Sequence, residues 1–235
     1  MNLFTRLPAL ALLAAGVVAG LALPAQADEQ CGAPDSFGAR QCSSGLSADK
    51  VRQMAVAQEQ PNWCWAASIS MIFAHHGYRV PQQEIVKGAF GVATDLPAPS
   101  GETMTNVLSV AWVDQDAKPF RPSALASDAF AKRYQVSNDQ VLAELAAGRP
   151  LLIGASRHAV VLVGLEFQRL AGGAVRITSG TVIDPQPGRG IRPMLTAELR
   201  PTYVAAVRVA AAGNPVRQEQ HLAEADARAD LSVLR

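Results

Sequence analysis

One cysteine in the sequence lies where a nucleophile is favoured. Cys64 follows Pro61 and Asn62 and precedes residues 65–74, an almost entirely apolar run without proline or glycine. Such a run predicts a buried helix, with Asn62 accepting hydrogen bonds from its first amides and Gly77 ending it. Partial positive charge at a helix N-terminus favours thiolate over thiol. Cys64 is therefore the candidate nucleophile.

A cysteine nucleophile needs a base, and the chain has four histidines. His75 and His76 would lie about 15 Å from Cys64 along a regular helix, which excludes them as the base. We expect them to be charges near the helix C-terminus. His221 lies in a polar tail, where exposure to solvent is the default. His158 opens an apolar strand directly after a turn, so it is the candidate base.

An acidic residue is expected to orient the base. Asp184 ends the strand that follows His158, and a hairpin through the turn at 172–173 would bring the two side by side. The alternative is that Asp184 only begins a turn. Asp114 and Asp116 are weaker candidates, because they lie in a predicted loop between helices. Asp184 is therefore the preferred third member.

Donors near the nucleophile would stabilise a tetrahedral oxyanion. The backbone N–H of Cys64 is one such donor, and the side-chain amide of Gln58 is the preferred second. Gln60 is also within reach and stays an alternative. Trp63 and Trp65, which flank the cysteine, are expected to pack rather than to contact substrate.

The secondary structure that must position these residues is predicted to change from helices to strands along the chain. Helical patterns come first, and β-branched runs bounded by Gly and Pro come later. This order predicts an α+β domain, with an N-terminal helical half packed on a C-terminal antiparallel sheet. Besides the helix at Cys64, the sequence predicts helices at 81–88, 103–112, 126–133 and 137–147 (the last with a capping box), loops at 89–101 and 114–125, and strands at 151–154, 158–167, 175–183 and 201–209.

The N-terminal sequence is typical of a targeting segment. Residues 1–27 have a basic start, an apolar stretch and a small-x-small cleavage pattern, which predicts a secretory signal peptide and export to the periplasm or the cell exterior. No other run is long enough to span a bilayer. The remaining chain divides into an N-terminal arm (28–50), one domain (51–212) and a charged tail (213–235). The loop between Gly91 and Gly101 is expected to border the site.

Charge and cysteine content narrow the function classes. Without residues 1–27, which contain only Arg6 as a charged residue, the 235-residue chain keeps 20 basic and 20 acidic residues. This balance argues against nucleic acid and membrane surfaces as partners. Cys31 and Cys42 lie in a polar, turn-rich segment and are disulfide candidates in an oxidising compartment, with two unpaired thiols as the alternative. Either way, Cys64 is expected to be a free thiol.

The ordered set of Gln58, the Trp63–Ala67 core, His158 and Asp184 resembles the compact bacterial papain-like cysteine proteases. That group includes staphopain-like enzymes, plant-pathogen effector proteases and double-glycine leader peptidases. The resemblance spans residues 55–186 and implies the papain-like fold. It also implies that Gln58 supplies the oxyanion hole, that Cys64 attacks, that His158 is the base, and that Asp184 takes the place usually held by asparagine in larger papain enzymes.

Two features depart from the papain pattern. Pro61 stands where the papain signature has a second cysteine, three residues before the nucleophile. The spacing between Cys64 and His158 is 94 residues, shorter than the roughly 130 or more of papain and the cathepsins. The specificity pockets of cathepsins are therefore not implied.

These residues together predict an exported cysteine peptidase that acts on peptides or proteins as a monomer, without metal or cofactor. Two alternatives remain open. The same scaffold could transfer acyl groups to amines or cell-wall peptides, as a transglutaminase or amidase does. It could also serve as a secreted binding module without catalysis, although all four expected residue types are present.

Overall fold

The computed structural model describes residues 29–211, within which the chain forms five helices and ten strands. The predicted signal peptide and the whole predicted charged tail, which includes His221, lie outside the described residues. Over 29–211, no helix has the length and apolar character needed to cross a membrane. In chain order the elements are β1 (Gln30–Cys31), β2 (Arg40–Gly45), α1 (Ala48–Met54), α2 (Cys64–His75), α3 (Gln82–Phe90), α4 (Gly101–Val107), β3 (Trp112–Val113), β4 (Pro119–Asp128), β5 (Arg133–Tyr134), α5 (Asn138–Ala146), β6 (Leu151–Ala155), β7 (His158–Arg169), β8 (Val175–Asp184), β9 (Gly190–Pro193) and β10 (Tyr203–Ala211).

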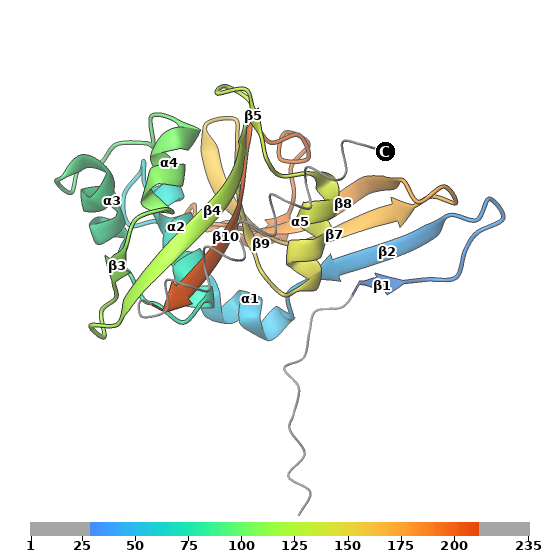
Figure 1. Ribbon diagram of the computed structural model, residues 1–235, viewed down its shortest axis with the longest axis horizontal. Helices are drawn as coiled ribbons and strands as arrows, with labels where there is room; N and C mark the ends of the chain where they lie inside the picture. Colours follow the sequence, from blue (N-terminus) through green and yellow to red (C-terminus); the bar gives the residue numbers. More distant parts are fainter. Residues whose placement is uncertain (1–28, 212–235) are drawn as a thin grey trace, which may run out of the picture.

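The described strands form one antiparallel sheet organised around β7 (Figure 1). One edge of β7 pairs first with β6 and then with β2, and the other edge pairs with β8. Beyond β6 the sheet continues through β10 and β4 to the short β3, while β9 extends it from β8. The predicted α+β class, with helices packed on an antiparallel sheet, is confirmed.

Helix α2 is the centre of the larger hydrophobic core. It lies against β7 and β6 on one side and against α1 and α3 on others. Its apolar sequence is buried on nearly every face, and each fully buried large side chain stabilises the fold by about 1.5–3 kcal/mol. Gly77, with φ of 87°, ends the helix region as predicted. The buried residues of α2 are Trp65, Ala66, Ala67, Ser68, Ile69, Met71, Ile72 and Phe73.

Strand β7 is covered on both faces, which explains its almost continuous apolar sequence. Val161 and Val163 belong to the core around α2, whereas Val160 and Leu162 belong to a second core that includes residues of α5. Helix α5 begins with the predicted capping box, in which Ser137 and Gln140 cap each other's backbone. Alternate side chains of one strand therefore hold helices on opposite sides of the sheet.

The middle of the chain differs from the prediction. Helix α4 ends at Val107, and most of the predicted loop at 114–125 belongs to the ten-residue strand β4. In place of the predicted helix at 126–133 lie the end of β4, a turn and the start of β5. Pro122 made a strand look improbable, because proline cannot donate a ladder hydrogen bond. In the structure, Pro122 pairs with Val209 of β10 on one side only. Among the described residues, no strand pairs with its other side, so the missing N–H breaks no ladder there.

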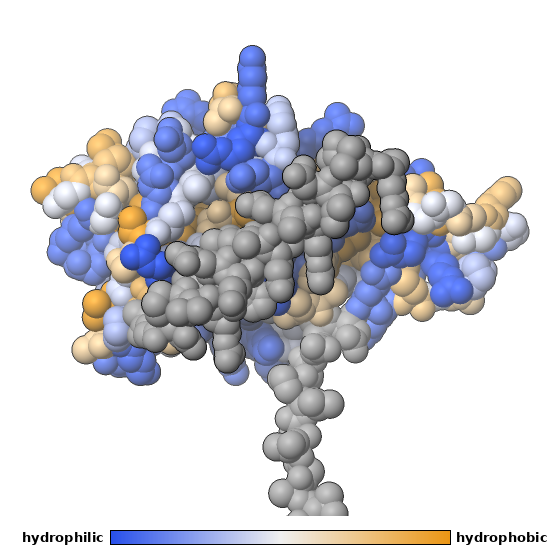
Figure 2. Space-filling view, viewed as in Figure 1, coloured by the Kyte–Doolittle hydropathy of each residue, from blue (hydrophilic) through white to orange (hydrophobic). Residues whose placement is uncertain are grey.

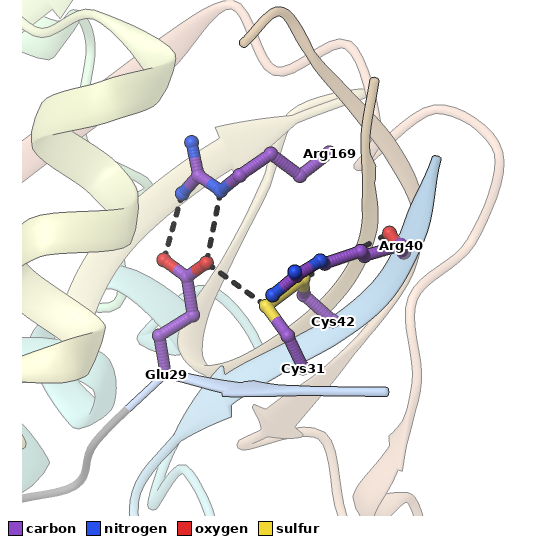
Figure 3. Close-up of a disulfide and its surroundings, with 5 residues drawn as sticks. All are labelled: Glu29, Cys31, Arg40, Cys42 and Arg169. Atoms are coloured by element: carbon purple, nitrogen blue, oxygen red, sulfur yellow. Dashed lines mark hydrogen bonds and ion pairs between the residues drawn. A yellow bond between two sulfur atoms is a disulfide. The ribbon is translucent and has the colours of Figure 1, made fainter. Parts of the chain in front are cut away.

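Part of the segment predicted as an arm belongs to the sheet instead. Strand β2 pairs with β7 along its whole length, and Cys31 of β1 lies opposite Cys42 of β2. These two cysteines form a disulfide (Figure 3). Glu29 accepts hydrogen bonds of 2.7 and 3.0 Å from Arg169 at the end of β7. The disulfide and this ion pair attach β1 to the edge of the sheet.

The hairpin tips at this end of the sheet carry exposed apolar side chains. Phe37, between β1 and β2, is 86% exposed, and Leu170 lies in the turn between β7 and β8. The two tips lie close together, since a Cβ added to Gly38 would lie 3.2 Å from the side chain of Ala171. Figure 2 shows apolar atoms at the same end of the molecule. The tips lie at the opposite end of β7 from His158.

Replacing both Cys31 and Cys42 by serine should lower stability without changing the reactivity of Cys64. The bridge closes a loop with a sequence separation of 11, for which loop entropy predicts about 2–3 kcal/mol. Cys42 pairs with Phe167, nine residues from His158 and so roughly 30 Å away along the strand. Urea denaturation and the rate of iodoacetamide labelling measure the two effects. Slower labelling of a folded double variant would contradict this separation.

Candidate active site

Cys64 is the first residue of α2, and the residue before it makes no side-chain capping hydrogen bond. Asn62, predicted to cap the helix, does not do so: its N–H bonds Asp95 Oδ1 at 2.9 Å, and its side-chain amide donates to Asp95 O at 3.3 Å. The residue at the N-cap position is Trp63. Among the described residues, the backbone N–H of Cys64 has no acceptor. The helix therefore begins with an unpaired donor at the sulfur-bearing residue.

The loop between α3 and α4 is attached to the nucleophile segment by indole groups. Trp63 Nε1 donates to Thr94 O at 2.9 Å, and Trp65 Nε1 donates to Leu96 O at 3.2 Å. Both tryptophans are buried, which agrees with the packing role predicted for them. The loop thus lies beside Cys64, as expected from the sequence, and its backbone is held there by the residues on either side of the nucleophile.

His158 is the first residue of β7 and pairs with Ala155 across a two-residue hairpin. Ser156 and Arg157 form that turn with φ of 51° and 64°, a region that non-glycine residues rarely adopt. The tight turn returns the chain at once, so His158 stands at the end of a rigid pair of strands. Its side chain is 26% exposed, which leaves the imidazole accessible to a substrate.

Asp184 ends β8, and the β7–β8 pairing brings it to His158. His158 Nε2 and Asp184 Oδ1 lie 2.7 Å apart, and no part of the Asp184 side chain is exposed. The other ring nitrogen, Nδ1, is left for Cys64. The pKa of His158 is raised above its usual value, chiefly by the Cys64 thiol; burial opposes the rise and Asp184 adds to it. The structure thus brings Cys64, His158 and Asp184 together.

Asp184 has the environment of a carboxylate that stays ionised. Burial raises its pKa, but hydrogen bonds from the Gln186 N–H, His158 and Arg192 more than offset this, so the pKa lies below its usual value. The Gln186 N–H bonds Oδ1 at 2.9 Å. An ionised carboxylate on Nε2 fixes the imidazole tautomer and its orientation.

Gln58 lies next to the triad, but its amide is engaged elsewhere. Its backbone N–H donates to Pro185 O at 2.8 Å, directly after Asp184. Its side-chain Nε2 donates to Gln60 O at 2.9 Å and to Pro61 O at 2.7 Å, and its buried Oε1 has no partner among the described residues. A role in the oxyanion hole requires this side chain to rotate and stays a prediction, as does the alternative, the exposed Gln60.

Two polar side chains that the sequence analysis did not single out join the parts of the site. Ser68, one turn after Cys64, donates to Ala159 O at 3.2 Å, next to His158. Gln82 of α3 binds the backbone on both sides of Gln58. Its Nε2 donates to Ala57 O at 2.8 Å, and its Oε1 accepts from the Glu59 N–H at 2.9 Å. A serine inside an apolar helix was a visible signal for the first contact. No local pattern indicated the second.

Within residues 29–211, the other histidine and aspartate candidates do not reach the triad. His75 and His76 lie at the far end of α2, as predicted, but they are not the expected charges. Burial lowers the pKa of both, that of His75 to about 4, so both are neutral at pH 7. Asp114 accepts backbone hydrogen bonds within its own turn, and Asp116 pairs with Arg79.

The described residues offer one grouping of potential metal ligands, which is not at the triad. Glu29, Cys31 and Cys42 place ligand atoms within 4.8 Å of one another. Because the two sulfurs are bonded to each other, they are not thiolate ligands (Figure 3).

One known protein family and several solved structures are similar to this chain. The family model described as "Peptidase_C39 like family" matches residues 49–206. Among solved structures, the peptidase domain of Streptococcus ComA, a bifunctional ABC transporter involved in a quorum-sensing pathway, is 13% identical with a TM-score of 0.39, covering 67% of this chain and 97% of that one. A double-glycine-motif protease from an AMS/PCAT transporter, in complex with its leader peptide, is 16% identical with a TM-score of 0.38, covering 65% and 89%. No curated protein matches the chain.

Replacing Ser68 by alanine should loosen the contact between the nucleophile helix and the strand of the base. The buried Ala159 carbonyl would lose its partner, at a cost of about 1–2 kcal/mol, and alkylation of Cys64 by iodoacetamide should slow. Ser70→Ala is the matched control, since Ser70 Oγ donates to Val80 O at 2.7 Å on the α3 side of the same helix. Thermal unfolding and labelling rates compare the two. Equal labelling in both variants would remove the positioning role of Ser68.

Proposed function

The chain belongs to the Peptidase_C39 like family and is a cysteine-type peptidase, and we propose that it cleaves peptide bonds through Cys64, His158 and Asp184 after export. One observation carries the proposal. His158 is held at 2.7 Å by a buried carboxylate on one ring nitrogen, and the thiol of the free cysteine Cys64 is the largest cause of its raised pKa. These two relations support a site made of a nucleophile, a base and a group that orients the base.

In the proposed reaction, the Cys64 thiolate attacks the carbonyl carbon of the scissile bond. The carbonyl electron pair moves onto oxygen and forms a tetrahedral oxyanion. When the C–N bond breaks, imidazolium His158 gives its proton to the leaving amine, and a thioester remains on Cys64. Water then attacks the thioester while His158 accepts its proton. Collapse of this second intermediate releases the acid and restores the thiolate–imidazolium pair.

The oxyanion would form beside the start of α2. The Cys64 backbone N–H, which has no acceptor among the described residues, supplies one donor. Gln58 supplies the second after its amide turns away from the carbonyls of Gln60 and Pro61. Gln82 holds the backbone on both sides of Gln58, so the side chain can rotate while the loop stays in place.

The proposed substrate is an extended peptide or a protein segment, and the proposed location is the periplasm or the cell exterior. The N-terminal pattern of residues 1–27 supports export. The Cys31–Cys42 disulfide also supports it, because such bonds persist in oxidising compartments.

Cleavage of a peptide library by the wild-type protein and by Cys64→Ala tests the proposal. The variant should lose activity by roughly 10⁴-fold or more, because it removes the nucleophile. It should unfold at the wild-type temperature, since Cys64 is only partly buried. Mass spectrometry of products formed with added amines and cell-wall peptides distinguishes hydrolysis from acyl transfer. Full cleavage by a folded Cys64→Ala protein would overturn the assignment.

A further inference from the structure

A second layer of charged residues lies behind the triad, on the side of Asp184 that faces away from His158. Asp184 Oδ2 accepts hydrogen bonds from Arg192 Nε at 2.9 Å and from Arg192 Nη2 at 2.7 Å. Arg189 Nη1 lies 3.7 Å from the same oxygen. Oδ1 is left to His158 and the Gln186 N–H. Each carboxylate oxygen therefore has its own set of donors, which fixes the rotation of the group.

The pairing of β8 with β9 explains how Arg192 reaches Asp184. Arg192 lies opposite Val182, and Asp184 lies opposite Gly190. Side chains at i and i+2 of a strand share a face, so Arg192 and Asp184 are diagonal neighbours on one face of the sheet. The fork of the guanidinium matches the carboxylate edge, a geometry that a lysine ammonium cannot reproduce.

Arg192 is itself held in place. Its side chain is only 14% exposed. Nη1 donates to Glu198 Oε2 at 2.8 Å and to Pro193 O at 2.9 Å, and Nη2 donates to Glu198 Oε1 at 2.5 Å. Glu198 is buried and also accepts the Leu195 N–H at 2.7 Å. An arginine whose side chain is mostly covered and lies between two buried carboxylates has little freedom to adopt another rotamer.

We propose that Arg192, clamped by Glu198, is a positioning residue that holds Asp184 ionised and aimed at His158. The inference rests on the proposed function of the triad and extends it by two residues, to a line of five groups: Cys64, His158, Asp184, Arg192 and Glu198. Charges alternate along this line when the thiolate–imidazolium pair is formed. Each buried charge then has an opposite neighbour, which offsets its desolvation.

Removal of Arg192 has a defined consequence for the pH dependence of the site. The groups that face Asp184 are His158 from β7, Arg192 from β9 and Arg189 from the preceding turn, with Cys64 of α2 and Glu198 one step further. Arg192 lowers the pKa of Asp184 against the effect of burial. Without it, Asp184 takes up a proton at higher pH, and the imidazolium loses its anionic partner there.

The test is the pH dependence of Cys64 alkylation by iodoacetamide in Arg192→Met. The acid-side midpoint of the labelling rate should move up by about one pH unit or more. Arg192→Lys keeps the charge but not the fork, so its midpoint should move less. Arg149→Met is the matched control, because Arg149 pairs with a different buried carboxylate, Glu144. It should lose stability and keep the wild-type midpoint.

A double variant and the labelling of the wild-type protein give two further results that can contradict the proposal. Arg192→Met leaves Glu198 buried without its partner, so Arg192→Met combined with Glu198→Gln removes that charge and should show the same shift in a folded protein. If either folded variant keeps the wild-type midpoint of the labelling rate, the role of Arg192 is overturned, but the triad is not. If the wild-type protein shows no enhanced labelling near neutral pH, the triad fails, and this inference fails with it. The two failures are distinguishable, because the first is seen only in the variants and the second is seen in the wild-type protein itself. Neither measurement requires a peptide substrate.

Discussion

The packing of helix α2 against strand β7 is the constraint on which the site depends. It places the first residue of a buried helix against the first residue of a central strand, so Cys64 meets His158 although 94 residues separate them. Ser68 adds a buried hydrogen bond between the same two elements. Because side chains of both elements are close-packed in one core, small shifts between them are opposed by packing as well as by this bond.

Polar groups around the triad are joined to one another rather than left to solvent. Indole, amide and hydroxyl side chains bind backbone carbonyls of the loops that flank the nucleophile, and the triad carboxylate binds an arginine that binds a second carboxylate. In a medium of low dielectric constant, such pairs are strong when complete, and an unpaired member is costly. The same contacts therefore stabilise the fold and hold the reacting groups in register.

Local sequence patterns predicted the elements that carry the triad but not the contacts that complete it. The apolar run after Cys64, the capping box of α5 and the β-branched runs were sufficient for α2, α5 and the main strands. Asn62 prefers Asp95 to the helix end, and β4 tolerates Pro122 only because of where it lies in the sheet. Arg192 meets Asp184 through the pairing of a short strand that no periodicity indicated. These outcomes depend on partners distant in the sequence.

Titration of the His158 ring by NMR, in the wild-type protein and in Cys64→Ala, tests most directly whether the sulfur and the imidazole are in contact. The Cys64 thiol is the largest cause of the raised pKa of His158, whereas burial acts in the opposite direction. Loss of the sulfur should therefore lower the titration midpoint of His158, and the burial-neutralised His75 provides an internal reference. An identical midpoint for His158 in both proteins would contradict the contact on which the site is built.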